Sequence, residues 1–137
     1  MKTFAWCLLG AMALITAPTA IPNSCGQDAP KPNQRAEFMR LKLNYSKSVL
    51  QGLVTEDFAA IADGARKLKR LSQAAEWEVP TIPHVEEYLA YTTDFQRIAD
   101  DLMKSAKAKN LDGATLAYTR MTINCVDCHK FVRGFAK

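Results

Sequence analysis

Hydrophobic and polar residues follow a helical period along most of this chain. From residue 34 to residue 134, apolar side chains recur every three or four positions, and no segment alternates as a half-buried strand would. The pattern predicts four amphipathic helices, at about residues 34–51, 55–77, 83–109 and 112–134. The expected fold class is therefore all-α.

Each predicted helix carries an apolar stripe that should face a common core. The stripes are Phe38, Leu41, Tyr45, Val49 and Leu53; Phe58, Ile61, Ala65, Leu68 and Leu71 or Ala75; Val85, Tyr88, Thr92, Phe95, Ala99, Leu102 and Ala106; and Leu116, Ala117, Tyr118, Met121 and Ile123. Because the connections are short, we expect an antiparallel up-down-up-down four-helix bundle. Such a bundle does not by itself specify a function.

Residues typical of helix ends give the expected boundaries. Gly52 is placed to stop the first helix, and Thr55 to cap the second. Pro83 suits the first turn of the third helix, because its missing N–H has no partner there in any case. Asp112 is the expected cap of the fourth helix, which should run to about residue 134.

The length and composition fit a single domain. The chain has 137 residues, of which 48% are hydrophobic, and this is enough for one ordinary core. The formal net charge is +4, and the Lys and Arg residues are mostly interleaved with acids. This distribution indicates neither a nucleic-acid groove nor a membrane-binding patch, so neither is an expected partner.

The N-terminal segment has the pattern of an export signal. Lys2 supplies a basic start, and residues 4–17 form an apolar run without charge. This run is too short to cross a bilayer as a helix, which takes roughly 20 residues, and we expect no transmembrane segment later in the chain. The sequence predicts a signal peptide and polar junction at residues 1–26 and an exported, periplasmic domain at residues 27–137.

Two signal cleavage sites remain open, because small residues are imperfectly spaced both at residues 17–20 and at residues 24–26. Cys25, at the second of these sites, raises the alternative of a lipid anchor. Residues 22–24 match poorly the leucine and small residues that usually precede a lipidated cysteine. Lipid anchoring at Cys25 is therefore the less favoured alternative.

Near the C-terminus stands a CxxCH sequence, formed by Cys125, Cys128 and His129. This pattern reads as a c-type haem attachment site. On a helix, positions i, i+3 and i+4 share a face, so both sulfurs and the imidazole can meet one flat porphyrin. We expect one covalently bound haem c, with thioethers from the two cysteines to the vinyl groups and His129 on the iron.

Other interpretations of this motif stay open, although each lacks a feature. A zinc site needs four ligands, and beyond these three the chain offers only His84 and Cys25 as further imidazole or thiol donors, apart from Cys7 in the signal segment. A thioredoxin-type redox pair needs a βαβ context, which is absent. A disulfide between Cys125 and Cys128 is awkward within a regular helix, and two unpaired buried cysteines are the remaining alternative.

A CxxCH on the last helix of a four-helix bundle resembles the cytochrome c prime family and its low-spin relatives. The resemblance covers nearly the whole mature chain. The family pattern CxxCHxxxR is met by Cys125, Cys128, His129 and Arg133, and a first-helix pattern Arg-x-x-x-apolar is met by Arg35 and Met39. One departure is the aromatic residue Phe131, which does not stand beside the arginine.

The resemblance implies roles for residues of the first helix. In the family, the residue four positions after the first-helix arginine faces the iron, so Met39 is the expected sixth ligand, next to His129 as the fifth. Arg35 and Lys42 are candidate partners of the haem propionates. Arg133 follows His129 by four residues, so its charge should lie near the imidazole or reach a propionate.

His84 and several aromatic residues are further candidates. His84 is the only other histidine, so bis-histidine ligation is an alternative, against a loop or capping role for this residue. Aromatic residues at helical spacing belong either to the plain core or to the haem pocket; these are Tyr45, Phe95, Tyr118 and Phe131.

With one redox centre and no acid–base pair, the expected function is periplasmic electron transfer to a redox partner protein, without enzymatic activity. A second hypothesis is a five-coordinate haem protein that binds nitric oxide or carbon monoxide. A haem peroxidase is a third, but it needs a distal base and an arginine that the sequence does not locate. The resemblance also implies a homodimer formed through the first two helices.

Overall fold

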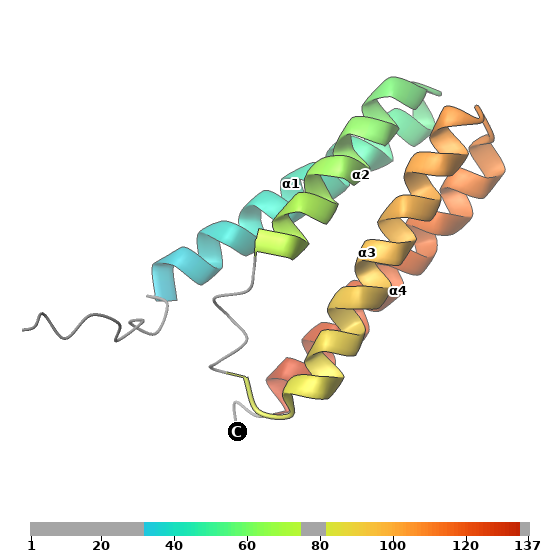
Figure 1. Ribbon diagram of the computed structural model, residues 1–137. Helices are drawn as coiled ribbons and strands as arrows, with labels where there is room; N and C mark the ends of the chain where they lie inside the picture. Colours follow the sequence, from blue (N-terminus) through green and yellow to red (C-terminus); the bar gives the residue numbers. More distant parts are fainter. Residues whose placement is uncertain (1–31, 75–81, 135–137) are drawn as a thin grey trace, which may run out of the picture.

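The structure is a computed structural model that describes residues 32–74 and 82–134, and the side chains from residue 34. These residues form α1 (Pro32–Val54), α2 (Phe58–Gln73), α3 (Val85–Lys107) and α4 (Leu111–Arg133) (Figure 1). The residues of the predicted export signal and its predicted cleavage sites, including Cys25, lie outside the described residues, as does the predicted helix end near Trp77.

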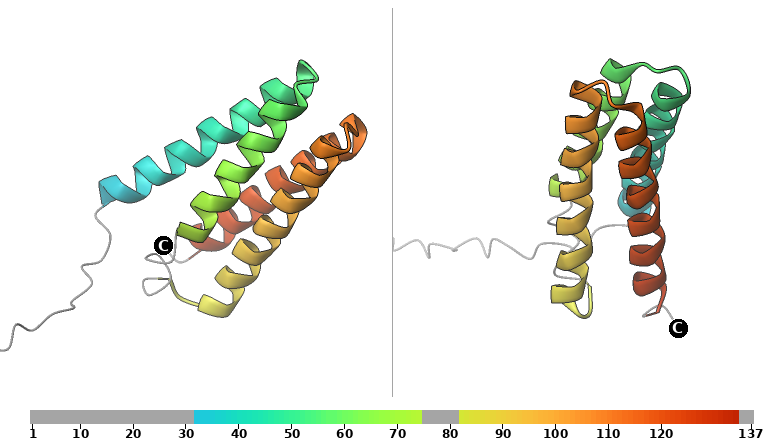
Figure 2. Two further views of the ribbon diagram at one scale, coloured as in Figure 1. Left: turned by 45° about the horizontal axis from the view of Figure 1, so that its top comes forward. Right: turned by 90° about the vertical axis from the view of Figure 1, so that its right-hand side faces the viewer.

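The four helices pack in the order in which they follow one another along the chain. α1 lies against α2, α2 against α3, and α3 against α4, and a shorter contact between α4 and α1 closes the arrangement. Successive helices run in opposite directions, as Figure 1 and Figure 2 show. The prediction of an all-α, up-down-up-down four-helix bundle is confirmed. None of the described helices combines the length and the apolar character that a membrane span requires.

The core is tightest at the end of the bundle where the short connections 55–57 and 108–110 lie. There the side chains of Val49, Ile61 and Leu102 are fully buried, each at 0% exposure. Toward the other end, the pair α1 and α2 diverges from the pair α3 and α4 (Figures 1 and 2). The bundle therefore has a closed end, filled by apolar side chains, and an open end.

Gly52 does not end α1, contrary to the prediction, because the helix continues to Val54. Gly52 is instead buried at the contact with α2, where an added Cβ would come within 2.9 Å of Ile61 Cγ1. Gly64 of α2 lies at the same helix contact, and a Cβ added there would lie 2.6 Å from Val49 Cγ2. The two glycines therefore allow α1 and α2 to approach closely.

The two predicted caps were also each wrong by two residues. Asp57, not Thr55, caps α2 by accepting a hydrogen bond from the Ala60 amide, because Thr55 donates its hydroxyl to the last turn of α1. Asn110, not Asp112, caps α4 by accepting from the Gly113 amide at 2.9 Å.

The third helix begins later than predicted. α3 starts at Val85, after His84 in a left-handed backbone conformation, so Pro83 precedes the helix rather than occupying its first turn.

The apolar stripes of α1, α2 and α3 face the core as predicted, with Val49, Ile61 and Phe95 among the buried residues. On α4 the prediction was partly wrong, since Leu116 and Ile123 are 63% and 55% exposed. Ala117 and Met121 of the predicted stripe are buried as expected, and Ala114 and Asn124 complete the buried face of α4.

Candidate cofactor cavity

The open end of the bundle encloses a cavity of about 670 Å³, which we call the bundle cavity. All four helices contribute to its walls, and Ile82 and Pro83 of the α2–α3 connection close one side. Its lining is mainly apolar, with a few polar groups. Pockets that hold small molecules and cofactors usually have volumes of about 300–1,000 Å³ and a similar character.

The CxxCH residues lie in the last third of α4 and line the bundle cavity together. Cys125, Cys128 and His129 share one face of the helix, as their spacing predicts. Both thiols are free; Cys125 is exposed and Cys128 is half-buried. The structure therefore presents two thiols and one imidazole to the same hollow.

Burial sets the protonation of these groups. Although the Cys125 residue as a whole is exposed, neighbouring atoms shield both sulfurs from water and raise the pKa of the Cys125 and Cys128 thiols, while the charge of Lys42 opposes that rise. Burial also lowers the pKa of His129, and the positive charges of Arg133 and Lys42 act in the same direction. A lowered pKa keeps the imidazole neutral near pH 7, and the neutral imidazole is the form that binds a metal ion.

The first helix supplies the remaining predicted residues of the site. Arg35 and Met39 both line the bundle cavity, and Met39 is half-buried. Lys42 lies on the same wall, with its ammonium 5.1 Å from the centre of the Phe38 ring and 5.3 Å from that of Phe95. These cation–π contacts hold one positive charge at the wall of an otherwise apolar hollow.

Some candidates lie beside the cavity rather than in its wall. Arg133 is exposed, and its link to the site is the charge that it exerts on His129. His84 is an exposed residue at the N-cap of α3 and is not part of the lining. Phe131 packs on Tyr91, with ring centres 5.4 Å apart, whereas Phe95 and Tyr118 face the cavity.

Ser72 of α2 is a cavity residue that sequence reasoning missed. It is 5% exposed, and its hydroxyl oxygen is buried without a hydrogen-bond partner in the part of the chain that is described. The sequence feature that could have identified Ser72 is its position, four residues after Leu68 and seven after Ala65, where a hydroxyl interrupts the apolar stripe of α2. A buried hydroxyl without a hydrogen bond typically lowers the stability of a folded protein by about 1–3 kcal/mol. The Ser72 hydroxyl is therefore expected to have an acceptor.

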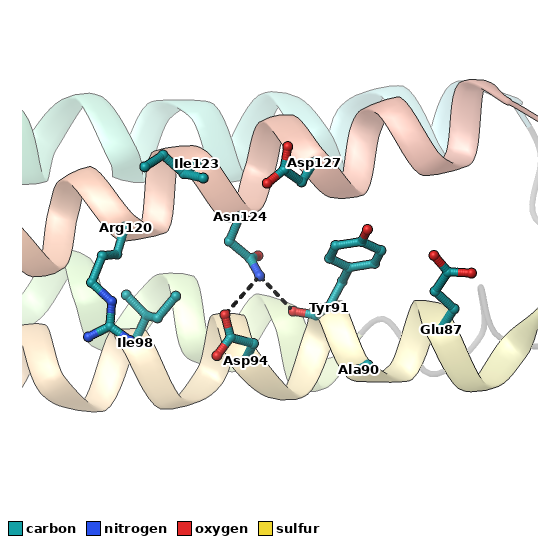
Figure 3. Close-up of a pocket in the computed structure, with 9 residues that line it drawn as sticks. All are labelled: Glu87, Ala90, Tyr91, Asp94, Ile98, Arg120, Ile123, Asn124 and Asp127. Carbon is teal, nitrogen blue, oxygen red and sulfur yellow. Dashed lines mark hydrogen bonds between the residues drawn. The ribbon is translucent and has the colours of Figure 1, made fainter.

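A second, shallower hollow lies on the outer side of α3 and α4, and Figure 3 shows its residues. In it, Asn124 points from α4 toward α3 and donates its amide N–H groups to the Tyr91 carbonyl at 3.2 Å and to Asp94 at 3.4 Å. Asn124 and Tyr91 line both hollows and so separate them. Because Asn124 directly precedes Cys125, these bonds fix the rotation that turns the CxxCH face toward the bundle cavity.

Comparisons with protein-family models, with curated proteins and with solved structures find no significant match for this chain. The inference of function therefore depends on the residues of the bundle cavity and on their arrangement.

Proposed function

We propose that this protein is a periplasmic c-type cytochrome that carries one covalently bound haem in the bundle cavity and transfers electrons to a redox partner protein. The observation that carries the proposal is the common cavity of the CxxCH residues and Met39. Met39 and His129 lie 90 positions apart in sequence, so folding of the bundle is needed to bring them to one cavity.

The residues present fit a haem. The cavity has the size and apolar lining of a cofactor pocket, and two free thiols at CxxC spacing face it. His129 is held neutral by its surroundings, as an iron ligand must be. Positive charge from Arg35 and Lys42 lies on the wall formed by α1, which suits the two carboxylates that a haem carries.

Each residue has a distinct task in this proposal. Cys125 and Cys128 would hold the cofactor by thioether bonds, His129 would supply an imidazole nitrogen to the iron, and Met39 would supply a thioether sulfur. When bound, the haem supplies a one-electron ferric–ferrous couple. The apolar walls limit access of water, and a His/Met ligand pair raises the reduction potential of cytochromes c.

The resemblance to the cytochrome c prime family gives the proposal its second form. If Met39 packs near the iron without binding it, an open coordination position is left, and binding of nitric oxide or carbon monoxide becomes the function. The coordination state of the iron distinguishes the two forms of the proposal, electron transfer and gas binding. Dimerisation through α1 and α2 belongs to the same resemblance and stays a proposal.

Optical spectroscopy of the full-length protein tests the proposed function. The chain is produced together with a haem-attachment system, purified, and measured in the oxidised and reduced states. We expect a low-spin, six-coordinate spectrum and reversible reduction. A high-spin, five-coordinate spectrum that changes on addition of carbon monoxide favours gas binding, and protein that carries no haem contradicts both forms of the proposal.

A further inference from the structure

The buried hydroxyl of Ser72 needs an acceptor that the protein does not provide. A serine within a helix often donates to the carbonyl four residues earlier, as Ser48 does to Asn44. Ser72 Oγ has no such bond and no other partner among the described residues, although the residue is only 5% exposed. Since buried polar groups in folded proteins are nearly always bonded, the acceptor is expected in the cavity that Ser72 lines.

Neighbouring hydroxyl groups of the bundle cavity do have partners within the protein. Ser46 Oγ and the Tyr118 hydroxyl lie 3.1 Å apart, and Thr92 Oγ1 donates to the Leu89 carbonyl at 3.0 Å. Thr122 Oγ1 donates in the same way to the Tyr118 carbonyl. Ser72 therefore differs from these residues, and the difference points to a ligand rather than to a general feature of the cavity wall.

A haem bound as proposed offers few acceptors to this hydroxyl. The four pyrrole nitrogens are bonded to iron, which leaves the carboxylate oxygens of the two propionates and any small ligand on the iron. The vinyl groups and the propionates occupy opposite edges of the ring. Thioethers to Cys125 and Cys128 would hold the vinyl edge at α4, so donors for the propionates would be expected on the other helices.

The helices away from α4 are where donors for carboxylates lie. Ser72 is on α2, which packs against α1 and α3 but has no contact with α4 among the described residues. The cationic side chains of the cavity wall, Arg35 and Lys42, are on the adjacent α1. The wall segments from α2 and α3 add no charged residue, and His129 on α4 is neutral near pH 7 because its pKa is lowered.

We propose that Ser72 Oγ donates a hydrogen bond to a propionate carboxylate of the haem and so fixes the orientation of that edge of the cofactor. Ser72 is thus a cofactor-binding residue on a helix that contributes neither a cysteine nor an iron ligand. This inference rests on the proposed function, because it requires haem in the bundle cavity.

Infrared difference spectroscopy of the haem-bearing protein, with haem labelled with ¹³C at the propionate carboxylates, tests the assignment directly. Ser72→Ala is expected to shift one carboxylate band and to lower the reduction potential, because an unbonded carboxylate keeps more negative charge near the iron. Ser72→Thr keeps the donor and is expected to keep both values near those of the wild type, whereas Ser72→Val, which has the shape of Ser72→Thr without the hydroxyl, is expected to behave like Ser72→Ala. Ser46→Ala is the control, since that hydroxyl is paired with Tyr118.

The outcomes separate this inference from the proposed function. Unchanged carboxylate bands in Ser72→Ala and Ser72→Val, with haem covalently attached, overturn the role of Ser72 and leave the cytochrome proposal in place. In the Met39→Ala background, where carbon monoxide is expected to bind, a change on Ser72→Ala confined to the carbon monoxide stretching band places the hydroxyl at the iron and also overturns it. Wild-type protein without covalent haem overturns the proposed function instead.

Discussion

At the scale of the residue, Met39 has the most specific task in the proposed site. Met39→Ala is expected to convert a low-spin spectrum to high-spin, to remove the weak far-red band of a ferric iron–methionine bond, and to allow carbon monoxide to bind. Leu43→Ala is the matched control, because Leu43 lines the same cavity one turn further along α1 but has no ligating atom. A low-spin spectrum that survives in Met39→Ala excludes Met39 as the ligand.

The two histidines are expected to respond differently to substitution. His129→Ala should keep the covalent haem, because the cysteines are untouched, but lose the normal proximal ligation. His84→Ala should leave the optical spectrum unchanged, since His84 is exposed at the start of α3 and does not line the cavity. Absorption spectra of the two variants are the measurement, and a changed spectrum in His84→Ala revives bis-histidine ligation.

Single residues differ in how far the sequence could predict their place. The CxxCH spacing on a helix is sufficient to put Cys125, Cys128 and His129 on one face, and the structure brings them to one cavity. Met39 was predicted only through the family resemblance. Ser72 carries no motif, and its significance depends on a missing partner, which is a property of packing in three dimensions.

At the scale of the element, close packing of α1 on α2 depends on glycine. Gly64→Ala is expected to destabilise the protein by about 1–3 kcal/mol, because the new Cβ lies 2.6 Å from Val49 Cγ2. Adding Val49→Ala removes the clashing methyl, so the double variant should lose less stability than the sum of the two single variants. Urea unfolding of the variants measures this, and strictly additive losses would contradict the contact.

The rotation of the helices can be tested on two leucines. Leu102 of α3 is 0% exposed, so Leu102→Ala is expected to cost about 2–5 kcal/mol of unfolding free energy. Leu116 of α4 is 63% exposed, so Leu116→Ala should change stability by no more than about 0.5 kcal/mol. Thermal or denaturant unfolding checks both values, and a large loss in Leu116→Ala would mean that α4 is rotated relative to the described structure.

Helical periodicity predicted the elements well because three of the four stripes face the core. The ends were less predictable, since a cap depends on which nearby oxygen reaches a free amide. The Thr55 hydroxyl donates to the Gln51 carbonyl at the end of α1. Asp57 therefore caps α2 by accepting from the Ala60 amide. On α4, Leu116 and Ile123 are apolar but exposed, because α4 contacts α1 over a shorter stretch than it contacts α3.

At the scale of the whole molecule, the bundle separates its most deeply buried core from its cavity. Its closed end holds fully buried side chains such as Ile61 and Leu102, and its open end holds the bundle cavity. Divergence of the two helix pairs leaves a hollow of about 670 Å³ at that end. The up-down topology was predictable from the short connections, whereas the divergence depends on the sizes of side chains from four separate helices and was not.

The central claim, a haem bound covalently through Cys125 and Cys128, is tested most directly by extraction under denaturing conditions. Acid-acetone treatment of the wild-type protein is expected to leave the pigment on the polypeptide, because thioether bonds do not depend on the fold. The double variant Cys125→Ala/Cys128→Ala is the control, and any haem that it binds should be extracted. Pigment that leaves the wild-type chain in acid-acetone would contradict the account.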